Sequence, residues 1–213
     1  MKNFGLIGAA GYIAPRHIQA IKDTGNKLVC ATDPHDSVGV LDRHFNDVKY
    51  FPEIERFDRF LEKRRRSELS EQIHWLSICS PNYLHDAHIR MALRVGTDVI
   101  CEKPVVINPW NLDALALMEK EYGRRIYTVL QLRVHPVILK LREKLMNNSD
   151  GKRHQVDLRY ITSRGPWYHS SWKGREMHSG GLIMNIGVHL FDLLLWLFGQ
   201  PVRYKVEDRS PFR

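Results

Sequence analysis

Short apolar runs alternate with amphipathic stretches along the first 131 residues of the chain. Runs of strand length occupy residues 4–7, 27–32, 75–79, 98–101 and 126–130. Apolar residues recur at helical spacing between them, as in 17–24, which Gly25 ends, and in 54–66. Such an alternation of strands and helices is typical of a parallel sheet of the Rossmann type. Ligands of these sheets bind at the carboxyl ends of the strands.

Another helix is marked by its ends. Asn108 can cap it, Pro109 suits the first helical position, and Gly123 stops it. Leu112, Leu115 and Leu117 supply its apolar contacts.

The pattern changes near residue 130. A helix is predicted from 133 to 147, followed by a turn-rich stretch at 147–151, a strand at 155–162, an apolar helix at 182–198 and a strand at 202–206. Two strands rarely form an independent layer. We therefore predict an α/β protein in which a Rossmann domain, residues 1–131, precedes an α+β second domain, residues 132–213, that is incomplete. Its apolar strand face predicts association, and we expect a homo-oligomer.

The most apolar segment, 182–198, is interrupted by Asn185, His189 and Asp192 and is shorter than the roughly 20 residues of a membrane span. It predicts a buried helix and no membrane partner. The apolar run at 4–7 is too short for a secretory signal. We expect a cytoplasmic protein.

The chain of 213 residues carries 32 Lys and Arg against 24 Asp and Glu, a net charge of +8. The basic residues at 63–66 suit the solvated end of a helix. No nucleic-acid motif accompanies them, and we expect no nucleic-acid partner. Cys30, Cys79 and Cys101 lack a CxxC spacing, so we expect reduced core residues and no metal.

A glycine turn, residues 8–14, follows the first predicted strand and precedes a helix. Glycine allows the backbone to approach a pyrophosphate, whose charge the N–H groups of the helix start can meet. The strict GxGxxG is absent, and we favour the register Ala9, Gly11 and Ala14 over one that starts at Gly8. A plain tight turn is the alternative. Cofactor contacts are expected at the positions Gly8, Ala10, Gly11, Tyr12 and Ile13.

Asp33 ends the second strand, 22 residues after Gly11. A carboxylate there can accept both ribose hydroxyls and would repel a 2′-phosphate, which predicts NAD as the cofactor. A helix N-cap is the competing interpretation of Asp33.

Two further strand ends carry motifs, Ser80-Pro81-Asn82-Tyr83-Leu84-His85 and Glu102-Lys103-Pro104, and a Gly180-Gly181 pair precedes the helix of Asn185, His189 and Asp192. Together with the glycine turn these motifs resemble the Gfo/Idh/MocA oxidoreductase family along the whole chain. Asn185 stands where many relatives have Asp, the glycine turn holds an extra residue, and relatives are usually longer.

The resemblance implies an NAD-dependent dehydrogenase. It adds cofactor contacts at Ser80, Pro81, Asn82, His85, Glu102, Lys103 and Gln131. Residues 80–90, 101–111 and 131–133 are most similar to members that oxidise the 3-hydroxyl of a UDP-linked N-acetylated hexuronic acid during synthesis of bacterial surface polysaccharides such as lipopolysaccharide. Another sugar or polyol dehydrogenase of the family, or a non-catalytic NAD(H)-binding module, remains the alternative.

Catalysis is expected from Lys103, His189 and Asn185. His189 lies four residues after Asn185 and three before Asp192, so the three share a helical face, and imidazole titrates near neutral pH. We expect His189 to be the base, Lys103 to orient substrate and relay protons, and Asn185 to bind substrate; Asp192 is expected to be structural. The alternative is a buried polar stripe without chemistry.

The substrate implied is an anionic nucleotide sugar. Arg133, Arg164 and Lys173 are candidates to pair with its carboxylate. Each could equally be a surface cation.

Overall fold

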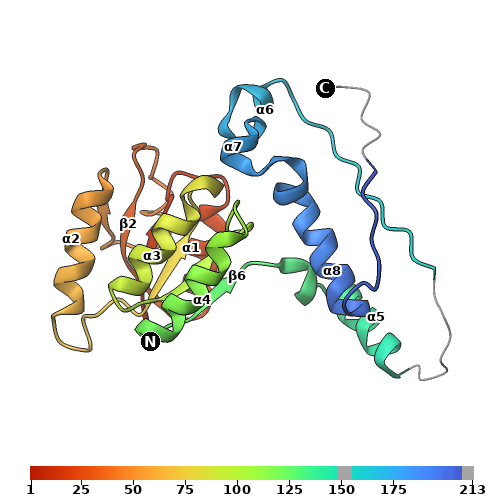
Figure 1. Cartoon of the computed structure of the whole chain (residues 1–213). Coiled ribbons are helices and arrows are strands. Elements are labelled where there is room, and N and C mark those ends of the chain that lie inside the picture. Colours follow the sequence, from red (N-terminus) through yellow and green to blue (C-terminus); the bar gives the residue numbers. More distant parts are fainter. Residues whose placement is uncertain (148–154, 208–213) are drawn as a thin grey trace. The chain divides into compact units, whose positions relative to one another are not determined.

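The computed structural model describes residues 1–147 and 155–207, so most of the predicted turn at 147–151 lies outside the described residues. The chain groups into two compact units (Figure 1). The first unit contains residues 1–129 and 163–185, and the second contains 130–162 and 186–213. Residues 163–185 thus group with the N-terminal part, whereas the sequence suggested a single boundary after residue 131. That boundary stays a prediction.

A parallel sheet with the strand order β3-β2-β1-β4-β5-β6 forms the centre of the first unit. This confirms the predicted α/β fold. The strands are β1 Asn3–Ile7, β2 Lys27–Thr32, β3 Lys49–Phe51, β4 Trp75–Ile78, β5 Asp98–Cys101 and β6 Ile126–Thr128. The sequence analysis missed β3, because three residues between a polar loop and Pro52 are too few to show a period. This short strand pairs with β2 alone and forms one edge of the sheet.

Helices cover both faces of this sheet. Figure 1 shows α2 (Ile54–Arg65), α3 (His85–Arg94) and α4 (Trp110–Tyr122), which contribute Phe57, Leu93 and Leu115 to one buried cluster. On the other face α1 (Ala14–Asp23) places Ile18 and Ile21 in a second cluster. Burial of these side chains on both faces supplies most of the favourable free energy of folding of this unit.

Helix ends in the first unit follow their capping residues. The N–H of Trp110 donates to Asn108 Oδ1 over 3.2 Å, and Gly123 ends α4 with a left-handed φ of 61°. The basic end of α2 matches the predicted solvated helix end, because Arg65 and Arg66 form ion pairs with Glu62. Helix α1 begins at Ala14, three residues before the predicted start, since Pro15 tolerates the first turn.

Short helical turns complete the first unit. They are η1 Asn82–Leu84, α6 Trp167–Ser170, η3 Trp172–Gly174 and α7 Glu176–Ser179. A π-helical turn, η4 Ile183–Gly187, crosses from the first unit into the second.

The second unit contains η2 Gln131–Val134, α5 Pro136–Asn147 and α8 Val188–Phe198. The strands predicted at 155–162 and 202–206 are wrong, because the described residues of both stretches have no regular secondary structure. A strand exists only through hydrogen bonds to a neighbouring strand, and neither stretch pairs with one.

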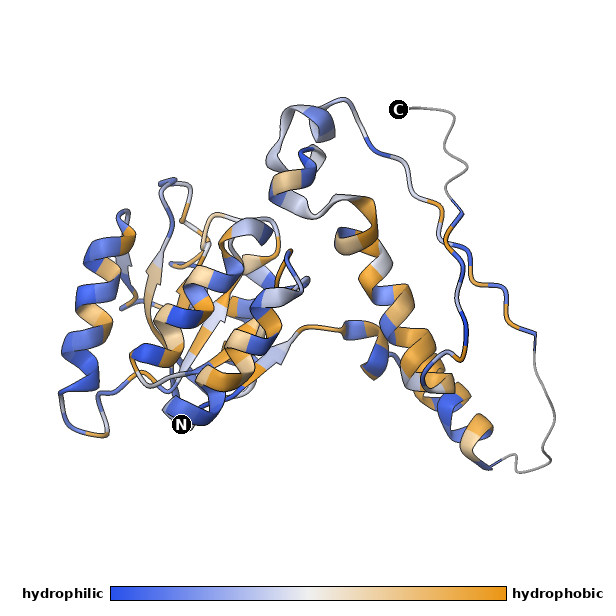
Figure 2. Ribbon diagram, viewed as in Figure 1, coloured by the Kyte–Doolittle hydropathy of each residue, from blue (hydrophilic) through white to orange (hydrophobic). Residues whose placement is uncertain are grey.

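Helix α8 is less buried than expected. Figure 2 shows apolar residues along most of its length, yet only Leu193 and Leu197 are buried, and Phe191 is 56% exposed. The prediction of a buried helix is therefore wrong for this structure, since the strands that would cover it do not form. Among the residues that the structure describes, one stretch, Glu176–Phe198, could cross a membrane by length and composition alone, a test that core helices of soluble proteins also pass.

Candidate functional site

A pocket of about 880 Å³ lies in the first unit, at the carboxyl ends of the central strands. Parallel sheets bind their ligands at this edge. The pocket gathers most of the residues singled out in the sequence, namely Gly8, Ala10, Gly11, Tyr12, Ile13, Asp33, Ser80, Pro81, Asn82, Glu102, Lys103, Lys173 and Asn185. Residues far apart in the chain thus form one wall.

The glycine turn begins one residue earlier than the favoured register. Gly8 has a φ of 86°, and a Cβ there would lie 2.6 Å from the carbonyl carbon of Cys79. Only glycine fits such a position. The tight-turn residue is therefore Gly8 and not Ala9, the first position of the favoured register, whereas Gly11 and Ala14 stay predictions. The N–H of Gly11 donates to the carbonyl of Gly8 over 3.1 Å and closes the turn.

Two backbone N–H groups at the start of α1 remain available to a ligand. The N–H of Ala10 donates to Asp33, and that of Ala14 donates to Gly11. For Tyr12 and Ile13, which both line the pocket, no N–H partner is found among the described residues. Successive N–H groups at a helix start form a site for an anion such as a phosphate.

The Asp33 side chain is 7% exposed and crosses from β2 to the glycine turn. Its Oδ2 accepts from the Ala10 N–H over 3.0 Å, and its Oδ1 accepts from the His35 N–H over 2.9 Å. These bonds tie the carboxylate to loop backbone, and no helix begins at Asp33, so the N-cap interpretation is wrong. Each oxygen can accept a further hydrogen bond from the pocket side.

His85 lies beneath the pocket and does not line it. The ring is fully buried, with Nδ1 2.7 Å from the carbonyl oxygen of Pro104 and Nε2 2.8 Å from that of Ser80. His85 therefore ties the loop after β4 to the loop after β5. Burial lowers its pKa.

His88 lines the pocket, although the sequence analysis did not select it. Its Nδ1 lies 2.9 Å from Ser80 Oγ, and burial, assisted by His85, lowers its pKa to about 4. The ring is neutral at neutral pH. One turn of helix separates His88 from His85, and this spacing could have pointed to it.

Asn82 connects the loop after β4 to the returning segment 163–185. Its Nδ2 donates to the carbonyl of Ser179 over 2.8 Å, and the ring of the adjacent Tyr83 lies 4.6 Å from that of His178. These contacts hold α7 against the first unit. They explain why the segment groups with the Rossmann part.

The ammonium group of Lys103 is held by Asn185. Its Nζ donates to the Asn185 backbone carbonyl over 2.6 Å and to Oδ1 over 3.1 Å. Burial lowers the pKa of Lys103, Glu102 opposes that shift, and Lys173 and Arg164 add to it. A lysine so placed loses a proton more readily than a solvated one. Asn185 lies in the π-helical turn, a distortion that often marks functional sites.

Lys173 lies at the pocket wall among aromatic rings. Its Nζ is 5.6 Å from the ring centre of Trp167, 5.8 Å from that of Trp172 and 5.9 Å from that of Tyr12. Burial, with repulsion from Arg164, lowers its pKa. Arg164 lies over Tyr168 and does not line the pocket. The sequence analysis missed Trp172, whose position beside Lys173 was the available signal.

The remaining candidates belong to the second unit. Gln131 and Arg133 lie in η2, and His189 lies in α8. Arg133 donates two hydrogen bonds to the Asp192 carboxylate, from Nη2 to Oδ1 over 2.5 Å and from Nε to Oδ2 over 2.9 Å. Asp192 thus has a structural partner, and Arg133 is engaged within its own unit.

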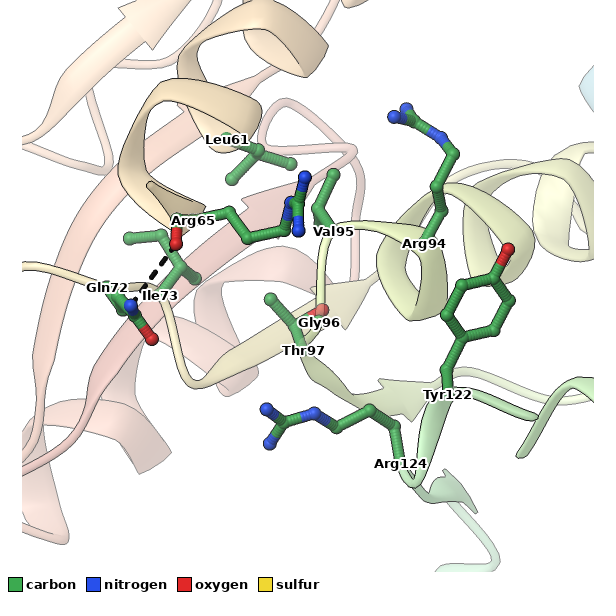
Figure 3. A pocket seen from close by; sticks show the side chains of 10 residues that line it. All are labelled: Leu61, Arg65, Gln72, Ile73, Arg94, Val95, Gly96, Thr97, Tyr122 and Arg124. Atoms are coloured by element: carbon green, nitrogen blue, oxygen red, sulfur yellow. Dashed lines mark hydrogen bonds between the residues drawn. The ribbon is translucent and has the colours of Figure 1, made fainter. Parts of the chain in front are cut away.

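A second pocket, of about 290 Å³, lies in the first unit near the C-terminal ends of α2, α3 and α4 (Figure 3). Arg65, Arg94 and Arg124 line it, and the first two form ion pairs with Glu62 and Asp58. Cations at helix C-termini offset the negative end of the helix dipole. These arginines therefore have a structural explanation.

The three cysteines are buried in the first unit as free thiols. Burial raises the pKa of all three, so none is reactive near neutral pH. Within residues 1–147 and 155–207, no three His, Cys, Asp or Glu side chains come together as a metal site would require.

Two family models match the chain. "Oxidoreductase family, NAD-binding Rossmann fold" matches residues 2–130, and "Oxidoreductase family, C-terminal alpha/beta domain" matches residues 142–211.

Solved structures give stronger likenesses. The WlbA (WbpB) dehydrogenase from Thermus thermophilus, in complex with NAD and alpha-ketoglutarate, is 47% identical with a TM-score of 0.89, covering 99% of this chain and 67% of that chain. The structure of this dehydrogenase in complex with NAD and UDP-GlcNAcA is 46% identical to the chain, with a TM-score of 0.88 and the same coverage of both chains.

Among curated proteins, D-glucoside 3-dehydrogenase of Escherichia coli (strain K12) is 27% identical over 135 residues. The match covers 63% of this chain and 38% of that protein. The chain thus spans well under two thirds of this relative.

Proposed function

Since the chain belongs to the Gfo/Idh/MocA oxidoreductase family, with its NAD-binding Rossmann domain in residues 2–130, we propose that it forms part of an NAD-dependent dehydrogenase. The reaction proposed is oxidation of the 3-hydroxyl of a UDP-linked N-acetylated hexuronic acid. One observation carries the proposal: the pocket that contains the glycine turn also holds the Lys103 ammonium against Asn185. The likeness to a dehydrogenase structure that contains NAD and UDP-GlcNAcA supports the substrate.

The pocket fits a dinucleotide. The N–H groups of Tyr12 and Ile13 would receive the pyrophosphate at the start of α1, and Gly8 and Gly11 leave room for it. Asp33 would accept the ribose hydroxyls. The rest of the cofactor would lie along the wall formed by Ser80, Pro81, Asn82, Glu102 and Lys103, with Gln131 as a further contact. When bound, NAD supplies the hydride acceptor. His85 supports this wall from below.

Oxidation of a secondary alcohol removes a hydride from the ring carbon and a proton from its oxygen. We assign the proton to the imidazole of His189 and assign Lys103 to bind the same oxygen and relay the proton. Asn185 holds Lys103 and offers its amide to the sugar. The lowered pKa of Lys103 suits a relay.

The substrate would be an anion, which suits a chain of net charge +8. Arg133, Arg164 and Lys173 are the proposed partners of its carboxylate. Lys173 is the best placed of these in the first unit, since it lines the pocket. We assign the reaction to the cytoplasm, in the synthesis of surface polysaccharide precursors, and the assembly to a homo-oligomer.

Purified chain is incubated with NAD and one of UDP-linked N-acetylglucosaminuronate, inositol or free glucose, while NADH is followed by absorbance. The uronate should be turned over fastest. Faster turnover of a neutral polyol would move the protein to another activity of the family. NADH binding without turnover of any sugar would favour a binding module, and calorimetry with the uronate then tests the substrate site directly.

A further inference from the structure

A buried hydrogen-bond chain links the middle of the sheet to the cofactor pocket. His17 of α1 has Nδ1 2.6 Å from Ser77 Oγ of β4, and Nε2 3.0 Å from Glu102 Oε1 at the end of β5. The His17 and Glu102 side chains are 11% and 14% exposed. Three elements distant in sequence therefore meet at one imidazole.

One tautomer of His17 satisfies every group in this series of hydrogen bonds. With the hydrogen on Nε2, His17 donates to the Glu102 carboxylate, and Nδ1 accepts the hydroxyl hydrogen of Ser77. With the hydrogen on Nδ1, two lone pairs would face each other at Nε2 and Glu102. The Glu102 carboxylate, which can only accept, thus selects the tautomer, and the Ser77 hydroxyl can rotate to suit it.

We propose that His17 is a positioning residue, which fixes the Glu102 carboxylate at the wall of the cofactor pocket and keeps it from the Lys103 ammonium. The proposal rests on the proposed function. One carboxylate oxygen is held by His17, while the other receives a long contact of 3.4 Å from the Lys103 backbone N–H. Glu102 itself lines the pocket, so the orientation of its carboxylate decides what charge a bound cofactor meets there.

Without His17 the carboxylate would have a stronger partner within reach. Lys103 is the next residue, and its ammonium is held by Asn185 through one carbonyl and one amide oxygen. A charge-assisted bond to a carboxylate is stronger than either. A released Glu102 would therefore draw Lys103 away from Asn185.

The charges around Glu102 agree with this arrangement. Burial raises the pKa of Glu102, but the hydrogen bond from His17, with the Lys103 N–H and ammonium, outweighs burial and leaves the pKa lowered. The other titratable groups that face Glu102 are the Cys79 and Cys101 thiols and His85. Burial raises the pKa of both thiols, so neither carries a charge beside Glu102 near neutral pH. His17 can be changed while the Lys103 ammonium stays in place.

The first experiment needs no activity. Nitrogen-15 NMR of histidine-labelled protein at pH 7.5 should show the His17 ring with its hydrogen on Nε2. A ring with its hydrogen on Nδ1 would overturn the proposal. The assignment follows from the signal lost in the His17→Gln variant.

The second experiment compares His17→Leu, which removes the bond, with His17→Gln, whose amide can still donate to Glu102. Gln19→Leu, an exposed position on the same helix, is the matched control. In His17→Leu, the Lys103 ammonium should titrate at higher pH by nitrogen-15 NMR, because it gains the Glu102 carboxylate as a partner, and NADH affinity should fall about five- to tenfold, the net contribution of one ordinary hydrogen bond. His17→Gln should restore most of both.

The outcomes separate the two proposals. If His17→Leu leaves the Lys103 titration and NADH affinity as in the unmodified chain, the positioning role is wrong whatever the activity. If both change as expected while no sugar is oxidised, the positioning role stands and the dehydrogenase proposal fails. Equal loss in His17→Leu and His17→Gln, with a normal urea midpoint in both, would also overturn the role, because the donor would not matter.

Discussion

The two units differ in how well they bury their apolar residues. The first unit has a six-stranded sheet with apolar clusters on both faces. In the second unit only Leu193 and Leu197 are buried among the described hydrophobic residues. Similar alternating patterns in the sequence led to strands in one unit and to irregular backbone in the other. An apolar alternation is therefore a conditional prediction: it needs neighbouring strands that complete the ladder.

Catalytic variants test whether both units contribute to the chemistry. Lys103→Ala in the first unit and His189→Ala in the second should each lower turnover by about 10²- to 10⁴-fold, because each removes a group that handles the substrate proton. NADH binding should change little in His189→Ala, whereas Lys103→Ala also removes a side chain of the cofactor wall. The measurement is the initial rate with the UDP-linked uronate, with the exposed Lys120→Ala as control.

Retention of near-full turnover by His189→Ala would exclude the second unit from catalysis. Loss of NADH binding in that variant would instead support a structural role for His189.

Core truncation should separate the units by stability. Phe57 is fully buried, so Phe57→Ala should lower the free energy of unfolding by about 3–5 kcal/mol. Leu195 on α8 is 40% exposed, and Leu195→Ala should cost less than about 1 kcal/mol. Urea unfolding followed by fluorescence and circular dichroism measures both. Equal losses would show that α8 has a buried core of its own.

The pH dependence of stability should come from histidines of the first unit. The folded pKa of His88 is about 4 against 6.5 for a free ring, so below pH 6.5 the unfolded chain binds a proton that the folded chain excludes. Stability should fall by about 2 kcal/mol, after allowing for partial exposure, as the pH drops from 6.5 to 4. Urea midpoints across this range should be flatter for His88→Gln. His85, whose pKa is also lowered, contributes with the same sign.

Cofactor choice tests the first unit alone. Because the Asp33 carboxylate would repel a 2′-phosphate, NADH should bind more tightly than NADPH, and Asp33→Ala should reduce that preference about tenfold. Fluorescence titration measures both affinities, and the exposed Asp36→Ala is the control. Equal affinities in the unmodified chain would contradict the assignment.

Association should involve the second unit. Leu158, Tyr160 and Val206 are 40%, 59% and 75% exposed, which predicts self-association at high concentration. Leu158→Lys with Tyr160→Lys should weaken it several-fold by light scattering, while Leu69→Lys, at an exposed site of the first unit, should not. A monodisperse monomer that binds no apolar dye would contradict this expectation.

Much of the first unit was predictable because its signals are local. Strand runs, capping residues such as Asn108 and Gly123, and the alternation of strands and helices all follow from short stretches of sequence. The edge strand β3 was not, since three residues carry no period. The strands at 155–162 and 202–206 failed for the opposite reason, as their pattern is clear but their partners are missing among the described residues.

The sequence predicted which residues belong to the candidate site better than it predicted which of them contact one another. Strand ends pointed to Asp33, Ser80, Glu102 and Lys103, all of which line the pocket. Sequence gave no means to see that Asn185 binds Lys103, 82 residues away, or that His17 reaches Glu102 from a helix. Such contacts depend on the packing of distant elements.

The chain passes from one unit to the other three times, after residues 129, 162 and 185. For recombination between related genes this has a practical meaning. A single crossover near residue 130 would join a glycine turn from one parent to Trp172, Lys173 and Asn185 from the other, although all of them line one pocket. Chimaeras that keep 163–185 with the N-terminal parent preserve that inherited wall, so exchange of substrate preference requires three junctions where the linear order suggests one.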